Sequence, residues 1–249
     1  MKKLASTAAT GLLLASMAMS ASAASYSFDF TQGDYLDPQP NLNYAYGDGQ
    51  SLTISGVSGY WGPNQSENVY QWGHYGVYVD GGTHLTTNAK GGYWDYQALV
   101  LDFGQAVTMD TFTLSYAMWG DFNNLSVLGL TDLDAPLNFQ TTWSGLLDNG
   151  WEHAGHPNAY KDIGPTDTVE VQSSLLSRYW IISAYNPAFG GSWEKYADGF
   201  KLGGLGFTVH DVSEIPLPAA AWLFLTGLAG MGWMKKRKAK REQAEVSVA

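Results

Sequence analysis

The side chains best suited to binding chemistry in this sequence are tryptophans in segments rich in glycine and asparagine. A flat, exposed indole can stack on the apolar C–H face of a sugar ring, while neighbouring amide and acidic groups bond the sugar hydroxyls. The alternative is that the rings pack in the core, as we expect for Trp180, which lies in an apolar run. For the other tryptophans the sequence leaves exposure open. The candidate glycan-binding residues are Trp61, Trp72, Trp143, Trp151 and Trp193.

Oxygen ligands suggest a second kind of chemistry. Calcium needs only hard oxygen ligands, and Asp121 and Asn123 lie close together in sequence, as do Asp132 and Asp134. Asp and Asn side chains also cap turns by bonding their own backbone, and the chain has no EF-hand spacing. Turn capping is therefore the favoured interpretation of these residues, and structural calcium is the one cofactor that the sequence suggests.

Catalytic residues are harder to assign. Glu152, His153 and His156 could ligate zinc, because imidazole and carboxylate groups suit that ion, but a solvated loop is the favoured interpretation. The sequence holds no Gly-x-Ser-x-Gly elbow, phosphate-binding loop or paired-histidine helix motif. We predict a non-enzymatic protein, and a metal-dependent hydrolase is the less favoured alternative.

The part of the chain between residues 25 and 214 is strongly acidic. It holds 5 basic and 21 acidic residues, a net charge of −16. Such a surface repels phosphate backbones, so we expect no nucleic acid as a partner. The chain has no cysteine, so disulfides and thiolate chemistry contribute nothing.

The first 23 residues have the three parts of a secretory signal. Lys2 and Lys3 precede an apolar run centred on residues 12–14, and small residues follow at 21–23. The run is shorter than the roughly 20 residues that a membrane span needs. We predict a signal peptide at 1–23, which signal peptidase cuts after Ala23, with Ala21 and Ala23 as the small residues of the cleavage site.

Residues 214–241 combine an apolar span with a basic flank. The 20 residues from 215 to 234 carry no charge, which is just long enough to cross a bilayer. The basic residues Lys235, Lys236, Arg237 and Lys238 follow, and a tail occupies 242–249. Basic flanks stay in the cytoplasm, so we expect residues 24–213 outside the inner membrane.

The start of this span resembles a known sorting signal. Ile215, Pro216, Leu217, Pro218 and Ala219 are similar to the PEP-CTERM signals of the subtype that begins Val-Pro-Leu-Pro-Ala, with Ile in place of Val. The resemblance implies that an exosortase in the inner membrane cuts near this motif and passes the body to the cell surface or the extracellular matrix of a biofilm. The tail is longer than such signals usually have. A permanent single-span anchor is the alternative, because an apolar span with a basic flank would look the same.

Residues 24–213 predict an all-β body. Tyr26, Phe28 and Phe30 alternate with polar residues, which is the period of a half-buried strand, and clusters of Gly, Asn, Asp and Pro separate the later apolar runs. A long aromatic-rich connection at 134–164 is typical of a functional loop. We expect a single antiparallel β-sandwich of the jelly-roll kind, with a barrel as the alternative. The further expected strands are 52–57, 76–79, 98–103, 107–116, 125–130, 177–184 and 202–209.

The order of segments between residues 76 and 128 resembles the body of exosortase-dependent surface proteins. A segment with His84 and Asn88 precedes the strand that ends in Asp102 and Phe103, and residues 121–128 are similar to that family's "dSdiSVL"-like strand. The family has no established activity, so the resemblance implies location alone. We predict an exported surface or matrix protein with an adhesive, non-enzymatic role. The alternative is a carbohydrate-binding module with exopolysaccharide as its partner.

Overall fold

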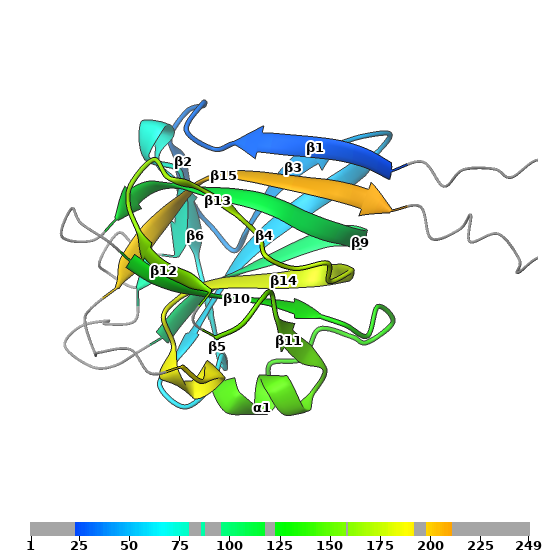
Figure 1. The fold of residues 1–249 in the computed structure, drawn as a ribbon. Coiled ribbons are helices and arrows are strands. Elements are labelled where there is room, and N and C mark those ends of the chain that lie inside the picture. The colour runs from blue at the N-terminus through cyan, green and yellow to red at the C-terminus, as the bar shows by residue number, and fades with distance from the viewer. Residues whose placement is uncertain are drawn as a thin grey trace, which may run out of the picture. The chain divides into compact units, whose positions relative to one another are not determined.

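The body is all-β, as the sequence predicts. The computed structural model describes residues 23–79, 86–87, 96–117, 123–157, 159–191 and 198–210, and Ser22–Asp211 form one compact unit. The described strands all belong to one antiparallel hydrogen-bonded sheet (Figure 1). Each strand expected from an apolar run is present, and several short strands join them.

The first half of the body consists of strands and one short 3-10 turn. These elements are β1 Ala23–Asp29, β2 Leu36–Gln39, β3 Asn41–Tyr46, β4 Gln50–Gly59, β5 Gln65–Glu67, β6 Val69–Gln71, the turn η1 Gly73–Tyr75, β7 Val77–Val79, β8 Thr86–Thr87 and β9 Tyr96–Ala117.

The second half contains the α-helix of the described residues. Its elements are β10 Asn123–Leu130, α1 Trp143–Asp148, β11 Trp151–His153, β12 Tyr160–Ile163, β13 Thr168–Glu170, β14 Ser177–Ala184, the 3-10 turn η3 Pro187–Phe189 and β15 Gly199–His210. The long connection expected at 134–164 thus carries α1, β11 and β12.

Strand β9 organises the sheet. Its 22 residues continue through Gly104, so the two strands predicted at 98–103 and 107–116 are one. Its first half pairs with β4 and β14, and its second half pairs with β13 and β15. Because one long strand belongs to both halves, the sheet curls around its apolar core (Figure 1).

Two apolar clusters lie on the two sides of β9. Successive side chains of a strand point to opposite faces, so Leu99 and Leu101 join the larger cluster, whereas Val100 joins the smaller one. The larger cluster holds Trp180, which is fully buried as predicted. The smaller cluster includes Trp143 from helix α1. This smaller cluster supports the candidate functional site.

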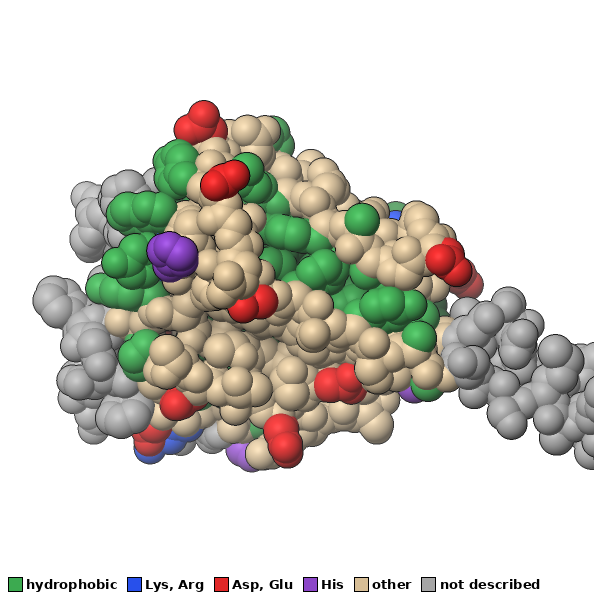
Figure 2. Space-filling view, turned by 90° about the horizontal axis from the view of Figure 1, so that it is seen from above, with side chains coloured by type: hydrophobic (Ala, Val, Ile, Leu, Met, Phe, Trp, Pro, Cys, Tyr) green, Lys and Arg blue, Asp and Glu red, His purple; other side chains and the backbone are tan. Residues whose placement is uncertain are grey.

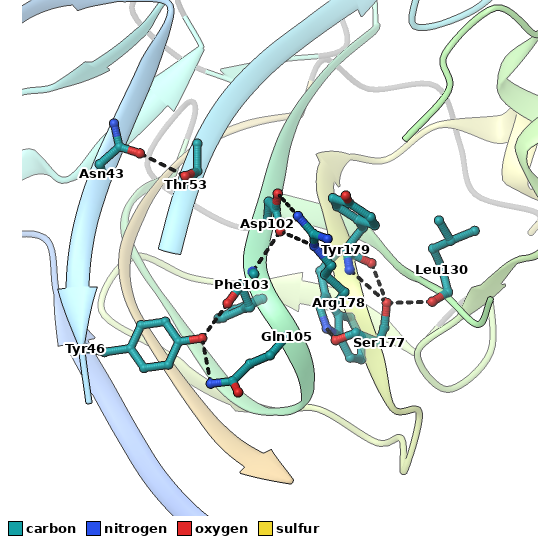
Figure 3. Close-up of polar contacts among 12 residues, drawn as sticks. Asn43, Tyr46, Thr53, Asp102, Phe103, Gln105, Leu130, Ser177, Arg178 and Tyr179 are labelled. Atoms are coloured by element: carbon teal, nitrogen blue, oxygen red, sulfur yellow. Dashed lines mark hydrogen bonds and ion pairs between the residues drawn. The ribbon is translucent and has the colours of Figure 1, made fainter. Parts of the chain in front are cut away.

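Polar contacts tie β9 to its neighbour β14 and to β3, which pairs with β4 (Figure 3). The Arg178 guanidinium of β14 donates from Nε and Nη2 to the two carboxylate oxygens of Asp102, at 2.8 and 3.0 Å. This hydrogen bond to Asp102 raises the pKa of Arg178 above its ordinary value. From β3, the Tyr46 hydroxyl donates to the carbonyl oxygen of Phe103 at 2.5 Å. These contacts favour the observed register of β3, β9 and β14.

The predicted targeting segments lie almost entirely outside the described residues. This holds for Ala21 and the rest of the signal peptide before Ala23, for the motif 215–219, for the basic residues 235–238 and for the tail. Ala23 is the first residue of β1. Within the described ranges, no helix has the length and apolar character that a membrane crossing requires.

Candidate functional site

The structure separates the five candidate tryptophans. Trp61 is 78% exposed and Trp72 is 41% exposed, whereas Trp143 and Trp151 are 1% and 3% exposed. For Trp143 and Trp151 the predicted glycan-stacking role is wrong, because both rings pack in the smaller apolar cluster and present no face to solvent. Trp193 lies outside the described residues. Trp61 and Trp72 remain as candidate platforms.

Trp61 stands beside a cleft of about 310 Å³. Its neighbour Tyr60 is 51% exposed, and the two ring centroids are 4.7 Å apart with the ring planes at 87°. The perpendicular rings form a corner at the mouth of the cleft. Such a corner can contact a flat apolar face with one ring and its edge with the other.

The backbone of this loop is held firmly although its rings are exposed. The Trp143 backbone N–H donates to the carbonyl oxygen of Trp61 at 3.1 Å, and Trp143 Nε1 donates to that of Gly59 at 2.8 Å. Gly62 allows this close approach, because a Cβ atom there would lie 2.1 Å from the carbonyl oxygen of Thr141. Trp61 therefore presents its ring from a fixed position, which lowers the entropy cost of binding.

Helix α1 forms the floor of the cleft. It begins at Trp143 because the Thr142 hydroxyl accepts a hydrogen bond from the Gly145 backbone N–H at 3.0 Å, an N-cap contact. The Trp143 ring then meets Tyr96 and Phe189 edge to face, with centroid distances of 6.5 and 5.8 Å. The buried tryptophan thus supports the exposed one.

Neutral polar groups line the cleft. Asn186 is fully buried and its Oδ1 accepts from the Ala188 backbone N–H at 3.0 Å, while its Nδ2 has no hydrogen-bond partner among the described residues. A buried donor without a partner costs about 1–3 kcal/mol, so a ligand oxygen or a water molecule would relieve it. Burial raises the pKa of Tyr96, and nearby Tyr60 and Tyr185 add to the shift. Its phenol is therefore neutral at physiological pH and can donate a hydrogen bond.

The described lining of the cleft is uncharged. Thr142 and Ser144 add hydroxyl groups to its wall, and none of its nine described lining residues is Asp, Glu, Lys, Arg or His. Rings for stacking, together with neutral donors and acceptors, suit an uncharged ligand that has both an apolar face and hydroxyl groups.

The predicted calcium ligands are not brought together. Asn123 begins β10, and Asp132 and Asp134 follow its other end, roughly 23 Å away at 3.3 Å per residue. Asn123 Oδ1 accepts from the Gly199 backbone N–H at 2.6 Å. Asp132 Oδ1 accepts from the Asp134 backbone N–H at 3.1 Å, the turn-capping alternative. These residues cannot share one ion; Asp121 lies outside the described residues, and calcium stays a prediction.

The zinc alternative finds no cluster either. His153 lies on β11, and its Nε2 donates to the carbonyl oxygen of Phe189 at 2.8 Å. Burial lowers the pKa of His153 below its ordinary value, so the ring is neutral near pH 7. The described part of the chain contains no group of three His, Asp or Glu side chains placed to hold a metal.

A larger hollow of about 480 Å³ lies over β1, β9 and β15 on the face seen in Figure 2. Hydroxyl groups such as those of Ser27, Thr111 and Thr113 line it, and Gly204 and Gly206 form part of its floor. None of the exposed large hydrophobic side chains lies among its lining residues. Without a stacking platform, this hollow is a weaker candidate than the Trp61 cleft.

Sequence reasoning missed Tyr60, Tyr96 and Asn186. Tyr60 had a usable signal, because it precedes Trp61 in a loop bounded by Gly59 and Gly62. Tyr96 and Asn186 had none, since only the tertiary fold brings β9 and η3 to this loop. No protein family model, curated protein or solved structure matches the chain.

Proposed function

We propose that this chain is an exported, exosortase-sorted protein of the bacterial surface or extracellular matrix, and that its non-enzymatic body adheres to polysaccharide through the Trp61 cleft. The observation that carries the binding proposal is a tryptophan 78% exposed on a backbone fixed by two hydrogen bonds. An exposed indole costs solubility, and a fixed one reduces the entropy lost on binding. We further propose that the curled sheet forms a β-sandwich of the jelly-roll kind.

The ends of the body support the processing part of the proposal. Ala23 pairs with His210 and Ala24 pairs with Val209, where β1 lies along β15. Signal-peptide cleavage after Ala23 would leave the rest of this pairing intact. A cut near 215–219 would fall beyond β15, which ends at His210. The first cut therefore removes only the Ala23–His210 pair of this ladder, and the second removes none of it.

Mass spectrometry of the protein isolated from its host tests the processing. We expect a mature N-terminus at Ala24 and a C-terminus near residues 215–219. A C-terminus at Ala249 would rule out exosortase cleavage and favour the permanent anchor.

Affinity electrophoresis in gels that contain bacterial exopolysaccharides tests the binding. We expect at least one uncharged polysaccharide to retard the wild-type protein, and Trp61→Ala to weaken that retardation. Leu137→Ala is a matched control, because Leu137 is also exposed but does not line the cleft. Equal retardation of wild type and Trp61→Ala across every gel would contradict the assignment of the cleft.

A further inference from the structure

A second aromatic surface surrounds the ammonium group of Lys201. Its Nζ lies 4.2 Å from the ring centroid of Trp72, 5.1 Å from that of Tyr75 and 5.6 Å from that of Tyr116, with the buried Tyr78 ring at 4.5 Å. Lys201 itself is 4% exposed, whereas Trp72, Tyr75 and Tyr116 are 41%, 49% and 40% exposed. These three exposed residues form what we call the Trp72 face. All lie within the range in which a cation attracts an aromatic ring.

The rings of the Trp72 face are held in place. The turn η1 is closed by the Tyr75 backbone N–H, which donates to Trp72 O at 2.7 Å, and the Trp72 N–H donates to Gly76 O at 3.0 Å. The Ser115 hydroxyl of β9 donates to Tyr75 O at 2.5 Å. Gly76 has φ +78°, and a Cβ atom there would meet Leu202 O at 2.2 Å. The face is thus organised before any ligand arrives.

The chemistry of this face repeats that of the Trp61 cleft. Both offer a tryptophan with tyrosines beside it, and at the Trp72 face the phenol groups of Tyr75 and Tyr116 can form hydrogen bonds. The cation beneath the rings is shielded from solvent, and the body around it carries a charge of −16. Because this cation is buried and the body is acidic, the exposed rings and phenol groups of the Trp72 face fit a neutral polymer better than an anionic one.

Two further exposed apolar side chains extend the surface. Tyr35 and Leu36 are 53% and 41% exposed, and Leu36 pairs with Gln71, the residue before Trp72. Several exposed rings together suit a chain of sugars better than a single sugar, because different rings can stack on successive units.

The two aromatic surfaces are separate. Trp61 accepts a hydrogen bond from the first residue of α1, whereas Trp72 lies directly after β6, which pairs with β2. In Figure 1, α1 and β2 lie on opposite sides of the body. We propose that the body carries two independent surfaces for neutral polysaccharide and thereby cross-links separate polysaccharide chains. This inference rests on the proposed function and adds a second site to it.

Counting sites tests the proposal directly. The protein isolated from its host is titrated by calorimetry with oligosaccharides from xyloglucan, galactomannan, a soluble β-glucan and the neutral exopolysaccharide of the host. We expect two sites per chain for wild type and for Leu137→Ala, one for Trp61→Ala, one for Trp72→Ala, and none for the double variant. Tyr75→Ala is a second probe of the face, and circular dichroism checks that each variant is folded.

Cross-linking is then measured as the viscosity of the long polymer. Wild type should raise it, whereas each single variant should bind without raising it, because one site cannot bridge two chains. If wild type shows one site, and if neither Trp72→Ala nor Tyr75→Ala changes binding at that site, the second surface is refuted and the proposed function stands. No binding of any of the four glycans would overturn both.

A contact between copies of the chain is the competing use of this face. Sedimentation velocity without polysaccharide distinguishes the two. Self-association that Trp72→Ala removes, with glycan stoichiometry unchanged, would overturn the proposal.

Discussion

Replacing Trp143 by alanine should destabilise the protein severely, whereas the same change at Trp61 should hardly affect stability. Trp143 is 1% exposed and packs in the smaller cluster, and truncation of a buried tryptophan costs about 3–5 kcal/mol. That range already contains the loss of the bond from Trp143 Nε1 to Gly59 O at 2.8 Å. Trp61 is 78% exposed, and substitutions of such surface residues usually change stability by less than about 0.5 kcal/mol.

A third variant separates packing from hydrogen bonding. Trp143→Phe keeps an aromatic ring in the cluster but removes the Nε1 donor, which leaves the Gly59 carbonyl oxygen without its partner. An unsatisfied buried polar group costs about 1–3 kcal/mol, so we expect a loss of that size and smaller than the loss in Trp143→Ala.

Urea unfolding followed by circular dichroism measures the three losses. The dependence of the unfolding free energy on urea should stay unchanged between variants, since the same surface is exposed on unfolding. The reasoning fails if Trp143→Ala unfolds within about 1 kcal/mol of wild type, because a cavity of that size must cost more. It fails equally if Trp61→Ala and Trp143→Ala lower the free energy of unfolding by the same amount.

Three further predictions follow from contacts elsewhere in the body. Asp102→Asn should cost no more than about 1 kcal/mol, measured by urea unfolding in low and high salt, because its ion pair with Arg178 is partly exposed; a larger or salt-independent loss would contradict this. Burial lowers the pKa of His153, so its contribution to stability should be complete above pH 6.5, the ordinary pKa of the group, and be lost as the pH drops below that value. Between pH 7 and pH 5 the Tm of His153→Gln should therefore fall less than the Tm of wild type, and an identical fall would refute the assignment. Gly76→Ala should lose more than about 1 kcal/mol, because alanine cannot easily adopt its φ of +78° and its Cβ would meet Leu202 O at 2.2 Å; unchanged thermal stability would show that the turn relaxes freely.

The long strands were predictable because each has enough residues for a period to show. Strands β4, β9, β10, β14 and β15 have 8 to 22 residues with continuous or alternating burial. Strand β3 was missed although Leu42, Tyr44 and Tyr46 alternate with small or polar residues, since the surrounding turn signals dominated the interpretation. Strands of two or three residues such as β5, β6 and β8 have no period of their own, and only their partners define them.

The exposure of the loop tryptophans was much harder to predict. Trp61 and Trp143 both lie near glycine and hydroxyl residues, so local composition does not distinguish them. One signal was available: Thr142 can cap a helix, and Trp143 and Leu146 have the three-residue spacing of one helical face. Both side chains are indeed buried against the body. For Trp61, the backbone is hydrogen-bonded to the first residue of a helix 82 residues later, which no local pattern contains.

The register of β1 and β15 bears on how binding and anchoring can coexist. Ala23 pairs with His210. The start of β1 and the end of β15 therefore lie at the same end of this strand pair, and the chain continues from there to both predicted processing sites. Lys201, beneath the Trp72 face, is nine residues before His210 on β15, roughly 30 Å away at 3.3 Å per residue. The end of β15 that leads to the predicted sorting signal is thus the end remote from the Trp72 face. A body held at His210 would still present this surface to a polysaccharide, so we expect glycan binding there to be the same before and after exosortase cleavage.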